Sequence, residues 1–134
     1  MKIVVDTNIL FSFFWKNSLT RRLLLTSNFD LISSEFALEE LNKYSGEICQ
    51  KLKISMKIFV EELSELNKII KFAPKKEYST FLKEAEEISP DEKDSEFFAL
   101  CLKYSCVLWS NDLALKNQNK VTVLSTEDIV DIIF

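Results

Sequence analysis

Apolar and polar positions follow one another along the chain in blocks that predict strands separated by helices. Short continuous apolar runs indicate strands covered on both faces, as in a parallel sheet. Longer segments whose apolar residues recur every three or four positions indicate amphipathic helices. The strands are predicted at residues 2–6, 29–33, 68–73, 106–110 and 120–124. The helices are predicted at about 8–15, 18–27, 34–44, 47–67, 75–88, 89–105 and 125–134.

This alternation predicts a single doubly wound α/β domain over residues 1–134. Strands joined by helices pair in parallel, and the helices then cover both faces of the sheet. A chain of 134 residues has the size of one ordinary domain, and it shows no repeat or linker. Its single glycine, Gly46, excludes a glycine-rich loop for binding phosphate.

The composition narrows the chemistry that the chain can perform. Histidine is absent, which excludes Ser-His-Asp and Cys-His nucleophile systems and zinc bound by imidazole. The net charge of −4 argues against a broad basic surface, although carboxylates that hold cations would themselves contribute negative charge. Three cysteines without CxxC spacing predict reduced thiols and a cytoplasmic location. No stretch reaches the roughly 18 apolar residues that span a bilayer, so no membrane association is expected.

Four acidic residues lie near the ends of predicted strands or near the starts of predicted helices. Asp6 ends the first strand, and Asp112 lies just past the fourth. Glu40 lies in the early turns of the helix after the second strand, and Asp94 lies near the start of the helix before the fourth. The carboxyl ends of the strands and the N-termini of the helices meet at one edge of such a sheet, where ligands bind. We therefore predict that these four carboxylates converge.

Each acid also has an ordinary explanation as a helix cap, a turn residue or part of a solvated face. A cluster of carboxylates without a basic partner repels itself, however, and a divalent cation relieves that repulsion. Oxygen ligands without Cys or His favour Mg²⁺ or Mn²⁺ over zinc. One or two such cations can orient a water, lower its pKa and stabilise charge on a phosphodiester.

Neighbouring polar residues are candidates for supporting such a site. Thr7 and Ser110 are predicted to hydrogen-bond a carboxylate or a metal-bound water. Asn8 and Asn111 are candidates for orienting the acids, with turn and cap roles as the alternative. Three cations are weaker candidates for binding phosphate, with ordinary surface charge as the alternative: Arg21, Arg22 and Lys93.

The aromatic run at residues 11–15 holds too many rings for one buried helical face, because successive residues point about 100° apart. Some of these rings are therefore expected to be exposed or covered by a partner, such as a second copy of the chain.

Three stretches of the chain carry a family resemblance. "VVDTNIL" is similar to the opening strand and first acid of the PIN-domain family of metal-dependent ribonucleases. "SSEFALEELNKY" resembles the second block of that family, with Glu40 as the match. "SPDEKDSEFFALCLKYSCVLWSNDLAL" resembles its third and fourth blocks, with Asp94 and Asp112 as the acids. The blocks occur in the family's order and span almost the whole chain.

The resemblance implies a Rossmann-like three-layer α/β/α sandwich with a parallel sheet of order 3-2-1-4-5. It also implies an endoribonuclease that cleaves single-stranded RNA with a water activated by Mg²⁺ or Mn²⁺. Many relatives are VapC-like toxins of toxin–antitoxin pairs, so the resemblance implies a homodimer silenced by a small antitoxin protein.

The chain departs from the family pattern at two places. Ala114 stands where relatives often carry a further acid two residues after Asp112, which leaves room for a site with one metal or weak metal affinity. Glu39 and Glu40 are adjacent, so either is a candidate for the second acid. Asp91, three residues before Asp94, is a candidate auxiliary ligand.

Three other functions are consistent with parts of the pattern. A haloacid-dehalogenase-type phosphatase also has an Asp after its first strand, but it needs a second Asp where this chain has Asn8. A response-regulator receiver domain needs an acid pair and a phosphoacceptor Asp that are not evident. A PIN-like module that binds RNA or protein without cleavage remains an alternative, although such a module would be expected to lack some of the four acids.

Overall fold

Five parallel strands form the centre of the protein, whose computed structural model describes residues 1–134. They pair in the order β3-β2-β1-β4-β5, which is the order implied by the family resemblance. All four pairings are parallel. The strands are β1 (Lys2–Val5), β2 (Asp30–Ser34), β3 (Ile70–Ala73), β4 (Val107–Trp109) and β5 (Val123–Leu124).

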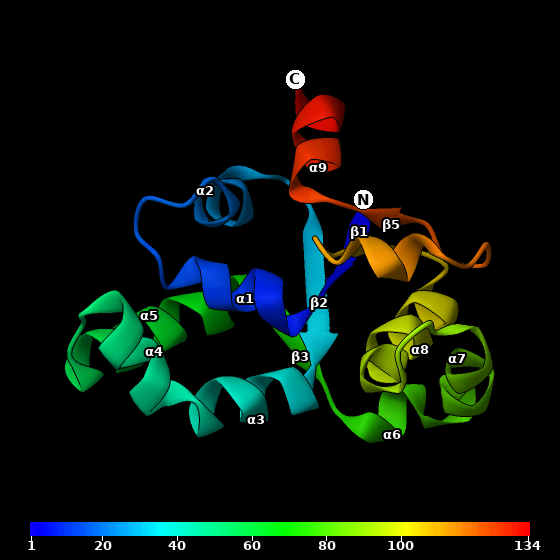
Figure 1. The fold of residues 1–134 in the computed structure, drawn as a ribbon, viewed down its shortest axis with the longest axis horizontal. Coiled ribbons are helices and arrows are strands. Elements are labelled where there is room, and N and C mark those ends of the chain that lie inside the picture. The colour runs from blue at the N-terminus through cyan, green and yellow to red at the C-terminus, as the bar shows by residue number, and fades with distance from the viewer.

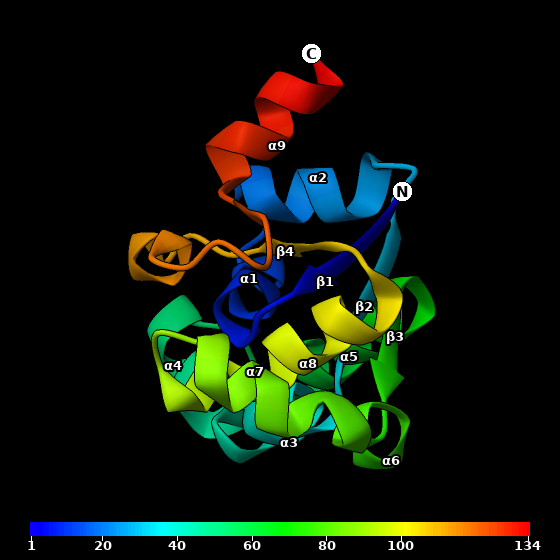
Figure 2. The same ribbon diagram turned by 90° about the vertical axis from the view of Figure 1, so that its right-hand side faces the viewer.

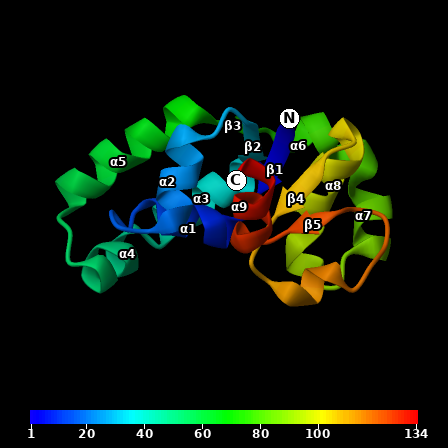
Figure 3. The same cartoon turned by 90° about the horizontal axis from the view of Figure 1, so that it is seen from above.

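Helices cover both faces of this sheet and make the predicted three-layer sandwich (Figures 1 and 3). One layer contains α1 (Thr7–Phe13), α2 (Leu19–Thr26), α3 (Glu35–Lys43), α4 (Ser45–Leu52) and α5 (Met56–Ile69). The other contains α6 (Lys75–Tyr78), α7 (Leu82–Ile88) and α8 (Ser95–Tyr104), which lie in front of the sheet in Figure 2. The last helix, α9 (Thr126–Ile133), projects beyond one end of the sheet, above α2 (Figure 2).

Three short 3₁₀ segments complete the described elements: η1 (Ser79–Phe81), η2 (Glu92–Asp94) and η3 (Leu113–Lys116).

The core lies on both sides of β1, as the apolar run at the start of the chain predicts. Ile3, Val4 and Val5 are fully buried. On one face they are covered by α8, which packs against β1, β2 and β4 and also against α7. A helix enclosed between a sheet and another helix is apolar on most of its surface. This explains why the chain is buried continuously from Phe97 to Cys101.

The predicted helix over residues 47–67 is wrong, because the chain breaks there into α4 and α5. Lys53 ends α4 with a left-handed backbone, φ +56°, a conformation that costs a residue other than glycine about 1–2 kcal/mol. The Ser55 hydroxyl then caps α5 by accepting a hydrogen bond from the Ile58 N–H at 3.1 Å. The two helices therefore run in different directions from a common turn.

Two other predicted helices, over residues 75–88 and from Ser89 onward, also need correction. The Asp91 side chain, rather than Ser89, caps the segment before α8, because it accepts a hydrogen bond from the Lys93 N–H at 3.0 Å. The chain forms η2 there and enters α8 only at Ser95. The segment over 75–88 is helical but is interrupted by η1.

The aromatic run divides between core and surface, as its spacing predicts. Phe13 and Phe14 are buried, and Phe11 is half-buried. Trp15 is 61% exposed. None of the helices combines the length and the apolar character that a membrane crossing requires.

Candidate active site

Asp6 stands at the centre of the site, where β1 ends and α1 begins. Its backbone N–H donates to the Trp109 carbonyl at 3.3 Å, so the strand pairing of β1 with β4 fixes its position. Its carboxylate is 4% exposed, and Oδ1 accepts a hydrogen bond from the Ile9 N–H at 2.9 Å. No lysine or arginine pairs with it. One oxygen therefore caps the helix, and the other is left without a counter-ion.

Burial raises the pKa of Asp6 above its ordinary value, and the charge of Asp112 adds to the rise. Hydrogen bonding from the Ser110 hydroxyl and from the Ile9 N–H acts in the opposite direction. The Ser110 oxygen itself accepts the Asp112 N–H at 3.1 Å. Ser110 thus lies next to the Asp6 carboxylate and also holds the backbone of Asp112.

Asp6 lines a cavity at this end of the sheet. Glu40 lines the same cavity from α3 and is held there by Thr7. The Thr7 hydroxyl donates to Glu40 Oε1 at 3.1 Å, and both side chains line the cavity. Glu39 is exposed and does not line it. The structure therefore places Glu40, and not its neighbour, with the other acids.

Asp94 enters the cavity between η2 and α8, and its pKa is raised to about 6. Burial is the main cause, and the charges of Asp6, Asp91, Asp112 and Glu40 follow in that order. A carboxyl whose pKa responds to four others shares one electrostatic environment with them. The convergence predicted from the topology is therefore present in the structure.

Asp112 follows β4 on an exposed loop and lines the same cavity. Its Oδ1 accepts the Ala114 N–H at 3.1 Å and so caps η3. The neighbouring Asn111 does not line the cavity. Its side-chain oxygen accepts the Thr126 N–H at 2.8 Å and ties this loop to the start of α9.

The cavity has a volume of about 490 Å³. Its lining includes five acids and none of them is in an ion pair: Asp6, Glu40, Asp91, Asp94 and Asp112. Thr7, Asn8, Lys43 and Lys93 complete the polar part of the wall.

This donor set fits a hard divalent cation, because it offers several carboxylate oxygens, no sulfur or imidazole, and a buried negative charge without a partner. No three of the acidic side chains are grouped tightly enough to hold a metal ion as they stand. Their carboxylates would have to turn toward a common point, which their mutual repulsion opposes until a cation is present.

Of the three basic side chains predicted to bind phosphate, the structure places only one in the wall of the cavity. Lys93 lines the cavity. Arg21 does not, because its guanidinium pairs with Glu62, donates to the Phe13 carbonyl and lies 4.4 Å from the centre of the Phe13 ring. Arg22 is exposed on α2 and lies outside the cavity as well.

Sequence reasoning missed Lys43, which lines the cavity beside Glu40. The signal was available, because residues three apart on a helix share a face. It also missed three aromatic side chains of the wall, Phe11, Phe36 and Tyr44. A fourth ring, Phe97, lines the wall from α8, and the position of all four depends on how α1, α3 and α8 pack together, which no local pattern encodes.

Comparison with known proteins agrees with this architecture. A chain of the crystal structure of VapBC2 from Rickettsia felis bound to a DNA fragment from their promoter superposes with a TM-score of 0.64 at 18% sequence identity. The match covers 93% of this chain and 98% of that one. No curated protein sequence matches the chain. The sequence profile of the PIN domain matches residues 4–129, which is nearly the whole chain, and the protein therefore belongs to the PIN-domain family.

Proposed function

We propose that this protein is a Mg²⁺- or Mn²⁺-dependent endoribonuclease that hydrolyses phosphodiester bonds in single-stranded RNA. The observation that carries the proposal is the convergence of Asp6, Glu40, Asp94 and Asp112 in one cavity, with no cation paired to any of them. PIN-domain proteins are nucleases that generally use divalent metal ions, which agrees with this donor set.

The four acids would hold the cation, and the residues around them fix their orientation. A divalent cation bound at such a site lowers the pKa of a water and stabilises negative charge on a phosphodiester. Asp6 is fixed by the Ile9 N–H, and the Thr7 hydroxyl fixes Glu40. Orientation of this kind matters because small displacements of acidic groups around a reacting centre reduce the rate steeply.

Lys43 and Lys93 supply positive charge where the substrate would enter. Both line the cavity, and neither is in an ion pair. They are therefore free to bind phosphates on either side of the cleaved bond. The exposed ring of Phe36 and the half-buried ring of Tyr44 offer apolar faces to unpaired bases, which supports a single-stranded substrate.

We further propose that the protein is the toxin of a toxin–antitoxin pair in the cytoplasm. The toxin would be a homodimer, and a small antitoxin protein would silence it. The support is the similarity to a chain of the VapBC2 structure. Large apolar side chains on the surface, among them Leu19, Leu25 and Ile132, give such partners a surface to cover.

Replacing one acid should abolish RNA cleavage while leaving the fold intact. We expect Asp6→Asn and Asp94→Asn to lower the rate on end-labelled single-stranded RNA of mixed sequence by at least about 100-fold with Mn²⁺ present, because each removes a charge that would hold the cation. Asp131→Asn, at an exposed acid of α9, is the matched control and should cleave like the wild type. Equal cleavage by all four proteins would contradict the mechanism. A wild-type protein that binds RNA without cleaving it would support the alternative of a binding module.

Metal binding should be visible without any assay of activity. Mn²⁺ at 100 times its Kd should raise the melting temperature of the wild-type protein by roughly 5–10 °C, because a ligand that binds only the folded state stabilises it. The rise should be lost in Asp6→Asn and retained in Asp131→Asn. Differential scanning calorimetry makes the measurement, and an equal rise in all three proteins would place the metal elsewhere.

The raised pKa of Asp94 predicts how stability depends on pH in the presence of a chelator. Its pKa is about 6 in the folded protein and near 3.8 in the unfolded chain, so the folded state binds more protons between these values. The contribution of Asp94 to the free energy of unfolding should therefore fall as the pH rises from about 4 to about 6 and stay low above that. Urea unfolding of wild type and Asp94→Asn across this window measures it. A constant difference between the two proteins would refute the shift.

The toxin role predicts arrest of growth. Induced expression of the wild-type chain in a bacterial host should reduce colony counts by a large factor, whereas Asp94→Asn should not, because the effect requires cleavage. Expression of Asp131→Asn controls for the burden of protein production. Normal growth with soluble, RNA-cleaving wild-type protein would argue against a toxin and leave the nuclease proposal standing.

A further inference from the structure

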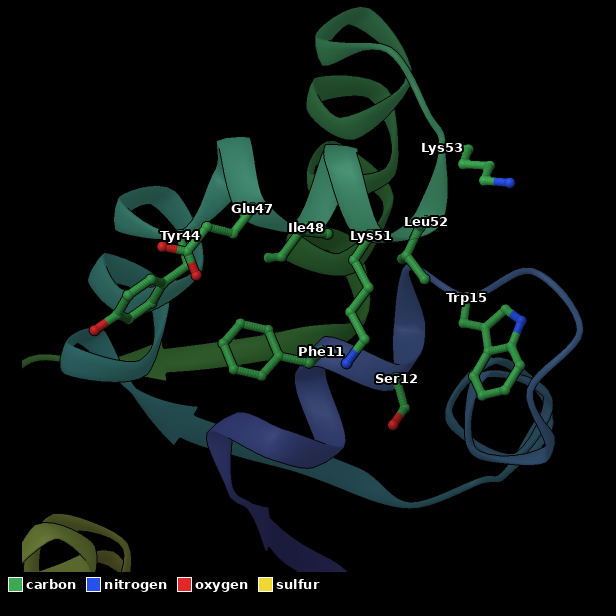
Figure 4. Close-up of a pocket in the computed structure, with 9 residues that line it drawn as sticks. All are labelled: Phe11, Ser12, Trp15, Tyr44, Glu47, Ile48, Lys51, Leu52 and Lys53. Carbon is green, nitrogen blue, oxygen red and sulfur yellow. The ribbon is translucent and has the colours of Figure 1, made fainter.

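A second hollow, a groove of about 800 Å³, lies between α1 and α4 (Figure 4). Phe11 and Trp15 line it from α1 and the turn that follows, and Tyr44, Lys51 and Lys53 line it from α4 and its two ends. In Figure 4 Tyr44 lies at one end and Trp15 at the other, with Lys51 reaching between them toward Phe11.

The groove continues directly from the acidic cavity. Phe11 and Tyr44 line both hollows, so the same two rings form the boundary between them. A polymer whose scissile phosphate lies at the acids would therefore pass these rings and enter the groove with its neighbouring units. This continuity gives the groove an occupant that already touches the proposed site.

The aromatic rings of the groove are each at least partly exposed, and Lys43 Nζ lies 5.4 Å from the centre of the Tyr44 ring. Trp15 is 61% exposed, and Phe11 and Tyr44 are half-buried. Rings held apart on a fixed wall can each accept the face of a base, which is how proteins bind single-stranded nucleic acid with little sequence preference. Such rings fit unpaired bases and do not fit a duplex, whose bases are stacked on each other.

The lysine side chains of the groove also have no ion-pair partners. Lys51 and Lys53 are exposed, and neither is in an ion pair. Lys53 keeps its side chain at a left-handed backbone position where glycine is the usual residue. Strained residues of this kind concentrate at functional sites. Together with Lys43 and Lys93 of the cavity, these lysines place unpaired positive charges along both hollows of a protein of net charge −4, and Glu47 is the only acid that lines the groove.

We propose that this groove is a subsite of the nuclease that takes the nucleotides flanking the scissile phosphate of single-stranded RNA. Bases stack on Trp15, Phe11 and Tyr44, and the phosphates between them lie against Lys51 and Lys53. An apolar peptide would cover the rings but leave both lysine charges unpaired, whereas a single-stranded polyanion uses the two kinds of side chain together. The proposal rests on the proposed function, because the acidic cavity supplies the fixed point from which the strand enters.

Trp15 provides a direct measure of binding. The chain has two tryptophans, and Trp109 is fully buried, so a change in exposed-tryptophan emission on adding RNA reports on Trp15. We titrate the full chain with a random-sequence 12-nucleotide RNA in the presence of a chelator, which separates binding from cleavage. The expected result is saturable quenching in wild type. Quenching should be absent with inorganic polyphosphate, which carries charge without bases.

The variants test the two kinds of contact separately by fluorescence anisotropy of the labelled RNA. Trp15→Ala should weaken RNA binding by about 5- to 100-fold, the range for removing one stacking partner, and leave polyphosphate binding unchanged. Trp15→Phe should recover most of the affinity. Lys51→Ala and Lys53→Ala should each reduce the slope of log affinity against log salt by about 0.7. Phe134→Ala and Lys57→Ala are matched controls at exposed positions that line neither hollow, and they should bind like wild type.

The outcomes separate this proposal from the one on which it rests. Cleavage by wild type, with RNA binding by the groove variants equal to that of the controls, overturns the subsite and leaves the nuclease standing. The groove would then be free for a protein partner. Groove-dependent binding of RNA without metal-dependent cleavage supports the subsite and overturns the nuclease. Wild type that neither binds nor cleaves RNA overturns both.

Discussion

A negative charge at the end of a buried strand is the constraint around which this domain is arranged. Asp6 is almost fully enclosed, and no cation pairs with it. Ionised groups in such places are costly unless hydrogen bonds or a bound ion compensate them. The protein supplies part of the compensation through the Ile9 N–H and Ser110. In the proposed function, the remainder falls to a divalent cation for which the other acids would provide the oxygens.

Two explanations of Asp6 that look like alternatives in the sequence are compatible with each other in the structure. Its Oδ1 caps α1 as any aspartate before a helix would, and the same side chain also lines the acidic cavity. A carboxylate has two oxygens, so a structural role for one leaves the other for chemistry. The cap also fixes the side chain, which gives the other acids a stationary neighbour.

The features predicted correctly are those that follow from local pattern and topology. The buried run at Ile3–Val5 and the alternation of strands and helices determine the parallel sheet, and the sheet determines which edge the acids share. The break at Lys53 carries no such signal, because a lysine is not a residue that normally marks a left-handed turn. Glu39 and Glu40 could not be separated, since their difference depends on the rotation of α3 by one residue. The groove between α1 and α4 was invisible for a related reason: it exists only through the relative placement of two helices that the pattern predicts separately.

The loop that carries Asp112 is anchored at a distance from the acids. Asn111 accepts the Thr126 N–H, and the Trp109 indole donates to the Thr126 hydroxyl at 3.1 Å, so both ends of the step from β4 into the loop are tied to the first residue of α9. The start of the final helix thereby helps to hold the loop of a proposed metal-binding side chain, although the helix itself projects beyond the sheet. A partner that binds this projecting helix and displaces Thr126 would therefore also displace the loop that carries Asp112.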